Sequence, residues 1–343
     1  ADNVRAYQQS ILIPTPPPIR RGGRELRVRY TPVDRVGVFV PGGSGSGAVL
    51  VSTMVMTIVP AQVAGVGRIA VISPPTADGD VSSAVLAVAA ELGADEVYRV
   101  SGTAGLAALA IGTDTMRRVD KIVGPGNAYI AEAKRQLFGR VGIDSIAGPS
   151  EVLIVADHTA DPAWVAADLL AQAEHAPGSA VLVTPSAALA EKVAEQIAEQ
   201  IVRLRRLGPL RKALQEYSAI LVVPDLAAAC DVANDFATEH LQIMTADDAG
   251  VLERIRHAGA IFVGPHTPVP LGDYYAGPSH VLPTGGGARF FGPLSCNDFR
   301  KASSVVHYDA AALAADARDV IDLATREGLT AHAAAVRRRL ADG

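Results

Sequence analysis

The sequence contains few of the residues that mark several common classes of protein. Only two of its 343 residues are cysteines, Cys230 and Cys296, which is too few for a disulfide framework or a zinc site made of thiolates. We expect both to be small buried hydrophobic residues. Aromatic residues make up only 5% of the chain. Alanine and valine take their place, which disfavours an aromatic-rich β-sandwich and favours helices packed on parallel strands.

The chain also lacks a large excess of charge and a long uninterrupted hydrophobic segment. The formal net charge is −5, without long runs of one sign. This argues against nucleic acid or a membrane surface as the main partner and leaves small polar molecules as candidates. The longest apolar run, residues 48–66, contains Ser52, Pro60 and Gln62, so we expect a buried helix rather than a membrane span. Because no signal peptide is visible, a cytoplasmic location is expected.

Short β-rich runs alternate with alanine-rich helical stretches along most of the chain. This alternation predicts the α/β fold class with parallel sheets, arranged as two successive units. The expected organisation is an N-terminal arm (1–34), a first α/β unit (35–150), a second α/β unit (151–292) and a C-terminal tail (293–343). The strands are predicted at 35–40, 68–73, 96–101, 121–125, 151–157, 180–186, 219–225, 241–245 and 260–265, with a last one at 303–309. The helices of the first unit are predicted at 48–66, 80–93, 103–112 and 127–139, and the tail is predicted to be helical over 311–340.

A glycine-rich segment, "VFVPGGSGSGA" (38–48), follows the first predicted strand. Gly43, Gly45 and Ala48 satisfy the dinucleotide-binding pattern G-x-G-x-x-G/A, in which a pyrophosphate sits at a helix N-terminus. However, the acidic residue expected about 20 residues further on is absent. The pattern therefore leaves open an ordinary glycine-rich connection or an anion or cofactor contact of another geometry.

The stretch "DLLAQAEHAPG" (168–178) places an amide and an imidazole near the end of a predicted helix. Gln172 and His175 are three residues apart, so their side chains lie on one face of that helix. An imidazole nitrogen and an amide oxygen can both bind a metal ion. The alternative is that His175, as a cation, caps the helix C-terminus. The segment by itself does not decide between these interpretations.

Other polar residues stand at places where α/β proteins build sites. Glu239 and His240 lie side by side before a predicted strand and offer a general base and a general acid, or else form a polar turn. Asp273 and His280 lie in a loop rich in glycine and proline, 270–290, where a functional role is favoured. Glu327 and His332 of the tail would usually belong to a surface helix. Without cysteine, zinc or a similar divalent ion would suit this ligand set: Gln172, His175, Asp273 and His332.

Several long segments resemble the histidinol dehydrogenase family, and the resemblance covers about residues 25–340. They are "KIVGPGNAYIAEAKRQLFGRVGIDSIAGPSEVLIVAD" (121–157), "DLLAQAEH" (168–175), "TEHLQI" (238–243), "RHAGAIFVGPHTPVPLGDYYAGPSHVLPT" (256–284) and "EGLTAH" (327–332). The resemblance implies two Rossmann-like parallel-sheet units with small N- and C-terminal extensions, in an intertwined homodimer. It also implies that zinc and NAD serve the oxidation of L-histidinol through L-histidinal to L-histidine.

The resemblance further implies a role for each matching residue. Zinc would be bound by Gln172, His175 and Asp273, and by His332 of the other subunit. Glu239 would activate the water that attacks the aldehyde, and His240 would take the alcohol proton. The substrate's polar groups would be held by Ser150, His280 and Glu327, the last again across the dimer. On the cofactor side, Asn127 would contact NAD.

Three differences from the family pattern lie on the cofactor side. Phe39 stands where the family has tyrosine, and Ala104 stands where the family has a glutamine that contacts NAD. The glycine-rich loop is also longer. In addition, the family has an N-terminal portion before "TPVDRVGVFVPGG" that this sequence does not show. Two alternatives therefore accompany the main prediction: a relative that oxidises another small polar alcohol or diol, and a zinc-binding scaffold without turnover.

Overall fold

The computed structural model describes residues 1–41, 50–175 and 177–341. Its contacts divide the chain into two compact units, which are described separately. The first consists of Ala1–Leu12 and Val33–Phe299, and the second of Ile13–Pro32 and Arg300–Gly343. The glycine pattern of Gly43, Gly45 and Ala48 lies outside the described residues and stays a prediction. No helix in the described ranges combines the length and the apolarity needed to cross a membrane.

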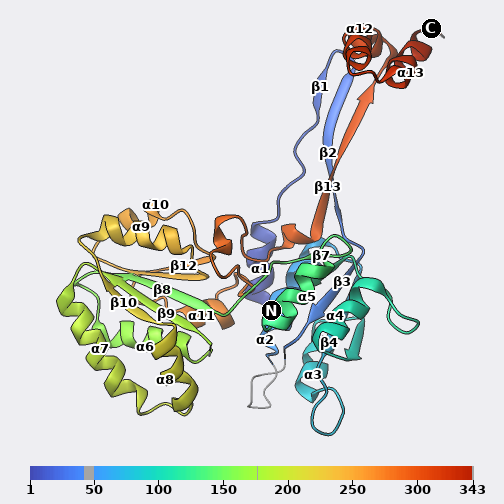
Figure 1. Cartoon of the computed structure of the whole chain (residues 1–343). Coiled ribbons are helices and arrows are strands. Elements are labelled where there is room, and N and C mark those ends of the chain that lie inside the picture. Colours follow the sequence, from blue (N-terminus) through green and yellow to red (C-terminus); the bar gives the residue numbers. More distant parts are fainter. Residues whose placement is uncertain (42–49, 176, 342–343) are drawn as a thin grey trace. The chain divides into compact units, whose positions relative to one another are not determined.

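The first unit contains two five-stranded parallel sheets, which confirms the predicted α/β class. The first sheet has the order β5-β4-β3-β6-β7, and the second has the order β10-β9-β8-β11-β12. In each sheet the strand that comes first in sequence is central, and the chain then winds outward in both directions. Figure 1 shows the second sheet with helices on both of its sides. The first sheet consists of β3 (Arg35–Phe39), β4 (Arg68–Ser73), β5 (Glu96–Arg99), β6 (Lys121–Val123) and β7 (Gly142–Ile143). The second consists of β8 (Glu151–Ala156), β9 (Ser179–Thr184), β10 (Ala219–Val222), β11 (His240–Met244) and β12 (Ala260–Val263).

Helices cover both faces of each sheet, and the strand residues alternate between them. Val36 and Val38 pack into one hydrophobic cluster, while Phe39 belongs to the cluster on the other face. Gly37 faces this second cluster because a Cβ there would lie 2.8 Å from Leu109 Cδ1. The helices of the first unit are α1 (Asp2–Ser10), α2 (Ser52–Ala64), α3 (Ser83–Glu91), α4 (Gly102–Ile111), α5 (Ala128–Leu137), α6 (Pro162–Ala173), α7 (Ala187–Ile201), α8 (Leu207–Glu216), α9 (Leu226–Phe236), α10 (Asp248–Arg254) and α11 (Val269–Tyr274), with short 3-10 turns at Gly287–Arg289 and Cys296–Phe299.

Two expectations about single segments are confirmed. The long apolar run forms the buried helix α2, in which Met54, Ile58 and Val59 are fully inaccessible to solvent. Both cysteines are buried and neither forms a disulfide. The apolar run thus contributes to the core of the first sheet rather than to a membrane span.

The second unit joins segments from the two ends of the chain. Strand β2 (Arg24–Pro32) pairs with β1 (Ile19–Arg21) and, along its whole length, with β13 (Arg300–Tyr308), and both pairings are antiparallel. Helices α12 (Ala310–Arg326) and α13 (Thr330–Ala341) follow. The predicted last strand and helical tail are present. Strands β1 and β2 were not predicted, and β13, which pairs with β2 along its whole length, lies far away in sequence.

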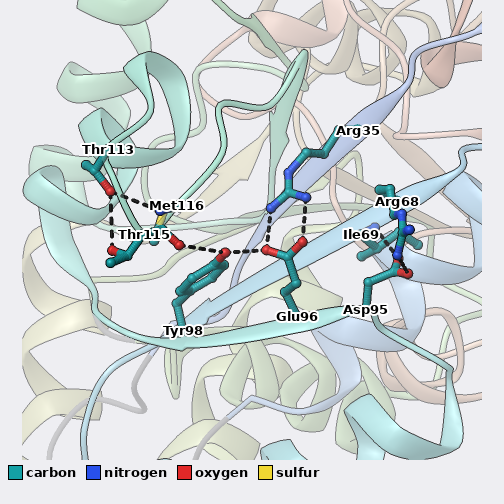
Figure 2. A network of polar contacts seen from close by, with 9 residues as sticks. All are labelled: Arg35, Arg68, Ile69, Asp95, Glu96, Tyr98, Thr113, Thr115 and Met116. Carbon is teal, nitrogen blue, oxygen red and sulfur yellow. Dashed lines mark hydrogen bonds and ion pairs between the residues drawn. The ribbon is translucent and has the colours of Figure 1, made fainter.

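Polar residues at the amino edge of the first sheet bind one another (Figure 2). Arg35, at the start of β3, donates two hydrogen bonds of 2.6 and 2.5 Å to the carboxylate of Glu96 at the start of β5. This bond with Arg35 lowers the pKa of Glu96 to about 2. The hydroxyl of Tyr98 also donates to Glu96. The network connects the outer strand β5 to the central strand β3. The carboxylate of Glu96 is paired with Arg35.

Candidate active site

The candidate site lies at the amino ends of β8 and β11 in the second sheet. These strands are parallel neighbours, and His240 is in register with Val152. Ser150 therefore stands immediately before β8 and Glu239 immediately before β11, next to each other in space. The Ser150 hydroxyl donates to Glu239 Oε2 at 2.5 Å, and the Glu151 amide donates to the same oxygen at 2.9 Å. The predicted position of Glu239 and His240 at the start of a strand is confirmed.

At the opposite edge of this sheet, one side chain connects the segments that follow β8 and β11. Asp157, directly after β8, accepts the amide of Ala246 after β11 at 2.9 Å. Its other oxygen accepts the amide and the hydroxyl of Thr159. In parallel α/β sheets ligands usually bind at the carboxyl edge, where the strand order reverses. In this sheet that position is bridged by Asp157, and the polar cluster is found at the other edge.

Helix α6 brings Gln172 into the cluster. Asp161 caps the start of the helix by accepting from the amides of Ala163 and Trp164. At the other end, Gln172 is buried and donates from Nε2 to the Ser150 hydroxyl at 2.9 Å. This bond uses the amide nitrogen and does not involve the amide oxygen.

His175 lies just beyond α6, in the turn that follows the helix, and not within it as predicted. Its amide donates to the Gln172 carbonyl at 3.1 Å. The residue is exposed, yet desolvation by the surrounding chain still lowers the pKa of its imidazole. A lowered pKa favours the neutral ring, which is the form of imidazole that binds metal ions.

His240 is buried, and its hydrogen bonds fix its tautomer. Nδ1 lies 3.2 Å from the Glu151 carbonyl oxygen. Because a carbonyl only accepts, Nδ1 carries the proton and Nε2 has a free lone pair. Nε2 has no hydrogen-bond partner among the described residues, and it lies 3.8 Å from Asp273 Oδ1. The buried Nε2 is thus available to accept a proton.

The segment that follows β12 supplies Asp273 and His280, and Asp273 lies in a short helix of this segment and not in a loop as predicted. Asp273 is in α11, and its backbone carbonyl lies 2.9 Å from His280 Nδ1. The other ring nitrogen of His280 lies 3.5 Å from the hydroxyl of Thr53 at the start of α2. The site therefore reaches from the second sheet to a helix of the first sheet. Thr53 and Glu151 were missed in the sequence because a threonine in a helix and a glutamate in a strand carry no motif.

Burial determines the electrostatics of this cluster. It raises the pKa of Glu239 to about 8 and that of Asp273 to about 6. It lowers the pKa of His240 to about 4 and also lowers that of His280. Among the described residues, no lysine or arginine acts on either carboxyl group. The site thus combines neutral imidazoles with carboxyl groups that lack a cationic partner.

This donor set fits a divalent cation in its chemistry. Neutral imidazole, carboxylate and amide oxygen are ligands that zinc accepts, and a cation would offset the desolvation of Asp273. Within the described ranges, no group of three or more histidine, cysteine, aspartate or glutamate side chains is placed to hold a metal ion. Three of the four predicted ligands belong to the first unit. Two of them, His175 and Asp273, are a histidine and an aspartate, and the third is the amide of Gln172.

Glu327 and His332 belong to the second unit. Glu327 follows α12 and His332 lies in α13, and both are exposed. The cluster described above consists of first-unit residues alone: Ser150, Gln172, His175, Glu239, His240, Asp273 and His280.

The predicted cofactor residues lie in or next to the first sheet, in a strand, a helix and a helix cap. The reversal of strand order falls between β3 and β6. Asn127 follows β6 and caps α5, and its Oδ1 accepts from the amides of Tyr129 and Ile130 at 3.1 and 3.2 Å. Phe39 ends β3, but its side chain is buried in the core, and Ala104 is exposed in α4.

Comparison with known proteins defines the class and then the family. The model of the histidinol dehydrogenase family matches residues 1–340. The histidinol dehydrogenase of Rhodopirellula baltica is 49% identical over 98% of this chain and 72% of its own length. The histidinol dehydrogenase of Geobacillus kaustophilus is 50% identical over 94% of this chain and 76% of its own length. The crystal structure of the enzyme from Elizabethkingia anophelis superposes with a TM-score of 0.93 and 32% identity, covering 99% of this chain and 78% of that one.

These similarities place the protein among the nicotinamide-dependent dehydrogenases, which are oxidoreductases that act on small molecules. More narrowly, the chain belongs to the histidinol dehydrogenase family.

Proposed function

We propose that the protein catalyses the zinc- and NAD-dependent, four-electron oxidation of L-histidinol to L-histidine through L-histidinal, in histidine biosynthesis. The observation that carries the proposal is that two groups able to accept protons, the carboxyl group of Glu239 and the imidazole of His240, lie next to each other. His240 Nδ1 lies 3.5 Å from Glu239 Oε2. One alcohol, one water and two NAD⁺ yield one carboxylate, two NADH and three protons, so the reaction needs a group that removes the alcohol proton and one that activates water.

His240 suits the first of these tasks. Its free Nε2 lone pair is held in place by the bond between Nδ1 and the Glu151 carbonyl. A neutral imidazole in this orientation accepts a proton from the substrate hydroxyl as hydride leaves the carbon. The residue is buried, so bulk water does not compete for Nε2.

Glu239 suits the second task. A carboxyl group whose pKa is raised to about 8 is a stronger base, once ionised, than an ordinary glutamate. The Ser150 hydroxyl and the Glu151 amide both bind Oε2. This leaves Oε1 to take a proton from the water that adds to the aldehyde.

We further propose that Gln172, His175 and Asp273 hold zinc, with His332 of a partner subunit as the fourth ligand. When bound, zinc would act as a Lewis acid that orients the amino alcohol. Ser150, His280 and the partner's Glu327 would hold the substrate's polar groups. This assignment requires a homodimer in which the second unit of each subunit contributes Glu327 and His332 to the site of the other subunit. Residues 35–150, including Asn127, would form the cofactor side, and residues 151–292 would form the substrate side.

A substrate survey tests the proposal. The purified protein is incubated with zinc, NAD and either histidinol, another amino alcohol or a diol, and NADH is followed by absorbance. NADH with histidinol supports the proposal. NADH only with another alcohol would indicate a relative of different specificity, and no NADH with any of them would indicate a scaffold without turnover. Either result would overturn it.

A further inference from the structure

A buried ion pair lies behind the segment that follows β6. Lys134 Nζ is 2.6 Å from Asp144 Oδ1, and both side chains are only 3% exposed. Lysine is rarely buried to this extent, and removing two charges from water is costly unless further hydrogen bonds satisfy them. A hydrophobic pair would fill the same space at a smaller cost. The other groups that Lys134 and Asp144 bind therefore indicate the role of the ion pair.

Both charged groups bind the peptide groups of one residue, Gly124. The ammonium of Lys134 donates to the Gly124 carbonyl at 2.5 Å, and Asp144 Oδ2 accepts from the Gly124 amide at 2.7 Å. The second oxygen of Asp144 also accepts from the Ser145 amide at 2.8 Å. Gly124 is thus held on both sides by side chains from α5 and from the end of β7.

The backbone at Gly124 is held against the neighbouring strand. Gly124 has a φ of +119°, and a Cβ there would lie 2.3 Å from the carbonyl oxygen of Phe39. Phe39 ends β3, and Gly124 follows β6, so this contact joins the two strands where the strand order reverses. That position is where doubly wound sheets bind their dinucleotide.

The fixed peptide leads directly to the proposed cofactor residue. Gly126 lies between Gly124 and Asn127, and a Cβ there would be 2.4 Å from Ile130 Cγ2 of α5. Ile130 and Lys134 are one turn apart and both are buried. Helix α5 therefore fixes the segment 124–127 at Gly126 through packing and at Gly124 through the ion pair.

We propose that Lys134 and Asp144 are positioning residues for the cofactor, which hold the segment 124–127 in the conformation that receives a dinucleotide. This inference rests on the proposed function, because it takes NAD as the ligand of this edge. Neither residue belongs to the proposed catalytic pair. They act through Gly124 by fixing the backbone before the cofactor arrives, which lowers the entropy lost on binding.

Binding measurements on three single variants test the proposal. Lys134→Met and Asp144→Asn are expected to raise the dissociation constant for NAD about tenfold or more, measured by calorimetry without histidinol. Zinc content and the KM for histidinol should stay unchanged. The matched control is Lys121→Met, at the other end of β6, where the ammonium donates to the Asp298 carbonyl. This control should bind NAD like the parent protein. Unchanged NAD affinity in folded Lys134 and Asp144 variants would overturn the proposal.

A double variant and hydrogen exchange keep the proposal testable if a single variant does not fold. In Lys134→Met/Asp144→Asn, the loss of NAD affinity should be smaller than the sum of the single losses, because the residues share one network. In the unaltered protein, the amide of Gly124 should be protected from exchange before NAD is added. A Gly124 amide protected only after NAD binding would contradict the proposal. Failure of the unaltered protein to bind NAD at all would instead refute the proposed function.

Discussion

Ser150 and Glu239 are 89 positions apart in sequence, yet the hydroxyl of the first donates to the carboxylate of the second at 2.5 Å. The contact exists because β8 and β11 are parallel neighbours and both residues stand one position before their strands. Gln172 extends the chain of hydrogen bonds by donating to the same hydroxyl. Through Ser150, the proposed general base is thus connected to a proposed zinc ligand.

Removing the serine hydroxyl should shift the pH dependence of activity. Burial raises the pKa of Glu239 to about 8, and the bond from Ser150 opposes this rise. In Ser150→Ala the pKa should therefore increase further, by about one unit if the lost bond is worth about 1.4 kcal/mol. The rise of kcat with pH, followed in NADH assays from pH 6 to 10, should move to higher pH. A profile that keeps its position would show that Glu239 is not the titrating base.

Glu239 should also make the metal-free protein less stable at alkaline pH. Its pKa in the folded state is about 8, above the ordinary 4.5, so the folded protein binds the proton more tightly than the unfolded chain does. The stability from this group is complete below pH 4.5 and is lost as the pH rises through 8. The free energy of unfolding, from urea titrations at pH 5 and 9, should fall by a few kcal/mol because of this residue. Glu239→Gln should remove most of that fall, and an equal fall in both proteins would contradict the assignment.

Zinc content tests the ligand assignment. We expect His175→Ala to lose most of its bound zinc, because the first unit supplies only His175, Asp273 and the Gln172 amide to the proposed set. Zinc is measured by mass spectrometry after gel filtration. His158→Ala is the control, because His158 is exposed at the opposite edge of the same sheet. Equal zinc in all three proteins would mean that His175 is not a ligand.

A second polar contact, between the buried Gln242 and the half-buried Asp168, connects β11 to α6. Gln242 lies two residues after His240 on β11, and its Nε2 donates at 2.7 Å to Asp168, one turn before Gln172. Burial raises the pKa of Asp168. Gln242→Leu leaves this carboxyl group without its partner and should destabilise the protein by about 1–3 kcal/mol. Adding Asp168→Leu should recover part of this loss in urea unfolding. If the double variant is less stable than Gln242→Leu, the buried pair is not the source of the effect.

Much of the fold follows from local sequence patterns. Ten strands were predicted from short β-rich runs, and each corresponds to a strand of the structure. Nine of them belong to the two parallel sheets, in which strands covered on both faces consist of nearly continuous apolar residues. The tenth, β13, is antiparallel and largely exposed. The pairing of β2 with β13 was not predictable in this way, since it joins residues such as Arg24 and Tyr308 that are far apart in sequence. Strand patterns locate strands, but they do not identify the partners of strands separated by two whole α/β units.

The candidate site was predictable only in part. The "QAEH" and "TEH" segments drew attention because polar residues interrupt apolar patterns, but their grouping rested on the family resemblance. Thr53 and Glu151 were missed, although they contact His280 and His240. Their contacts depend on tertiary folding, which brings α2 to the loop after β12 and β8 to the side of β11. Lys134 and Asp144 were missed for the same reason, because burial of a charged residue cannot be read from its type.

The most direct test of the central claim is the stoichiometry of the complete reaction. A limiting amount of histidinol is converted with zinc and excess NAD, and NADH is measured at the end point together with histidine by chromatography. We expect two NADH and one histidine for each histidinol. One NADH with accumulation of the aldehyde, or no NADH at all, would contradict the assignment of Glu239 and His240 to two successive oxidations at one site.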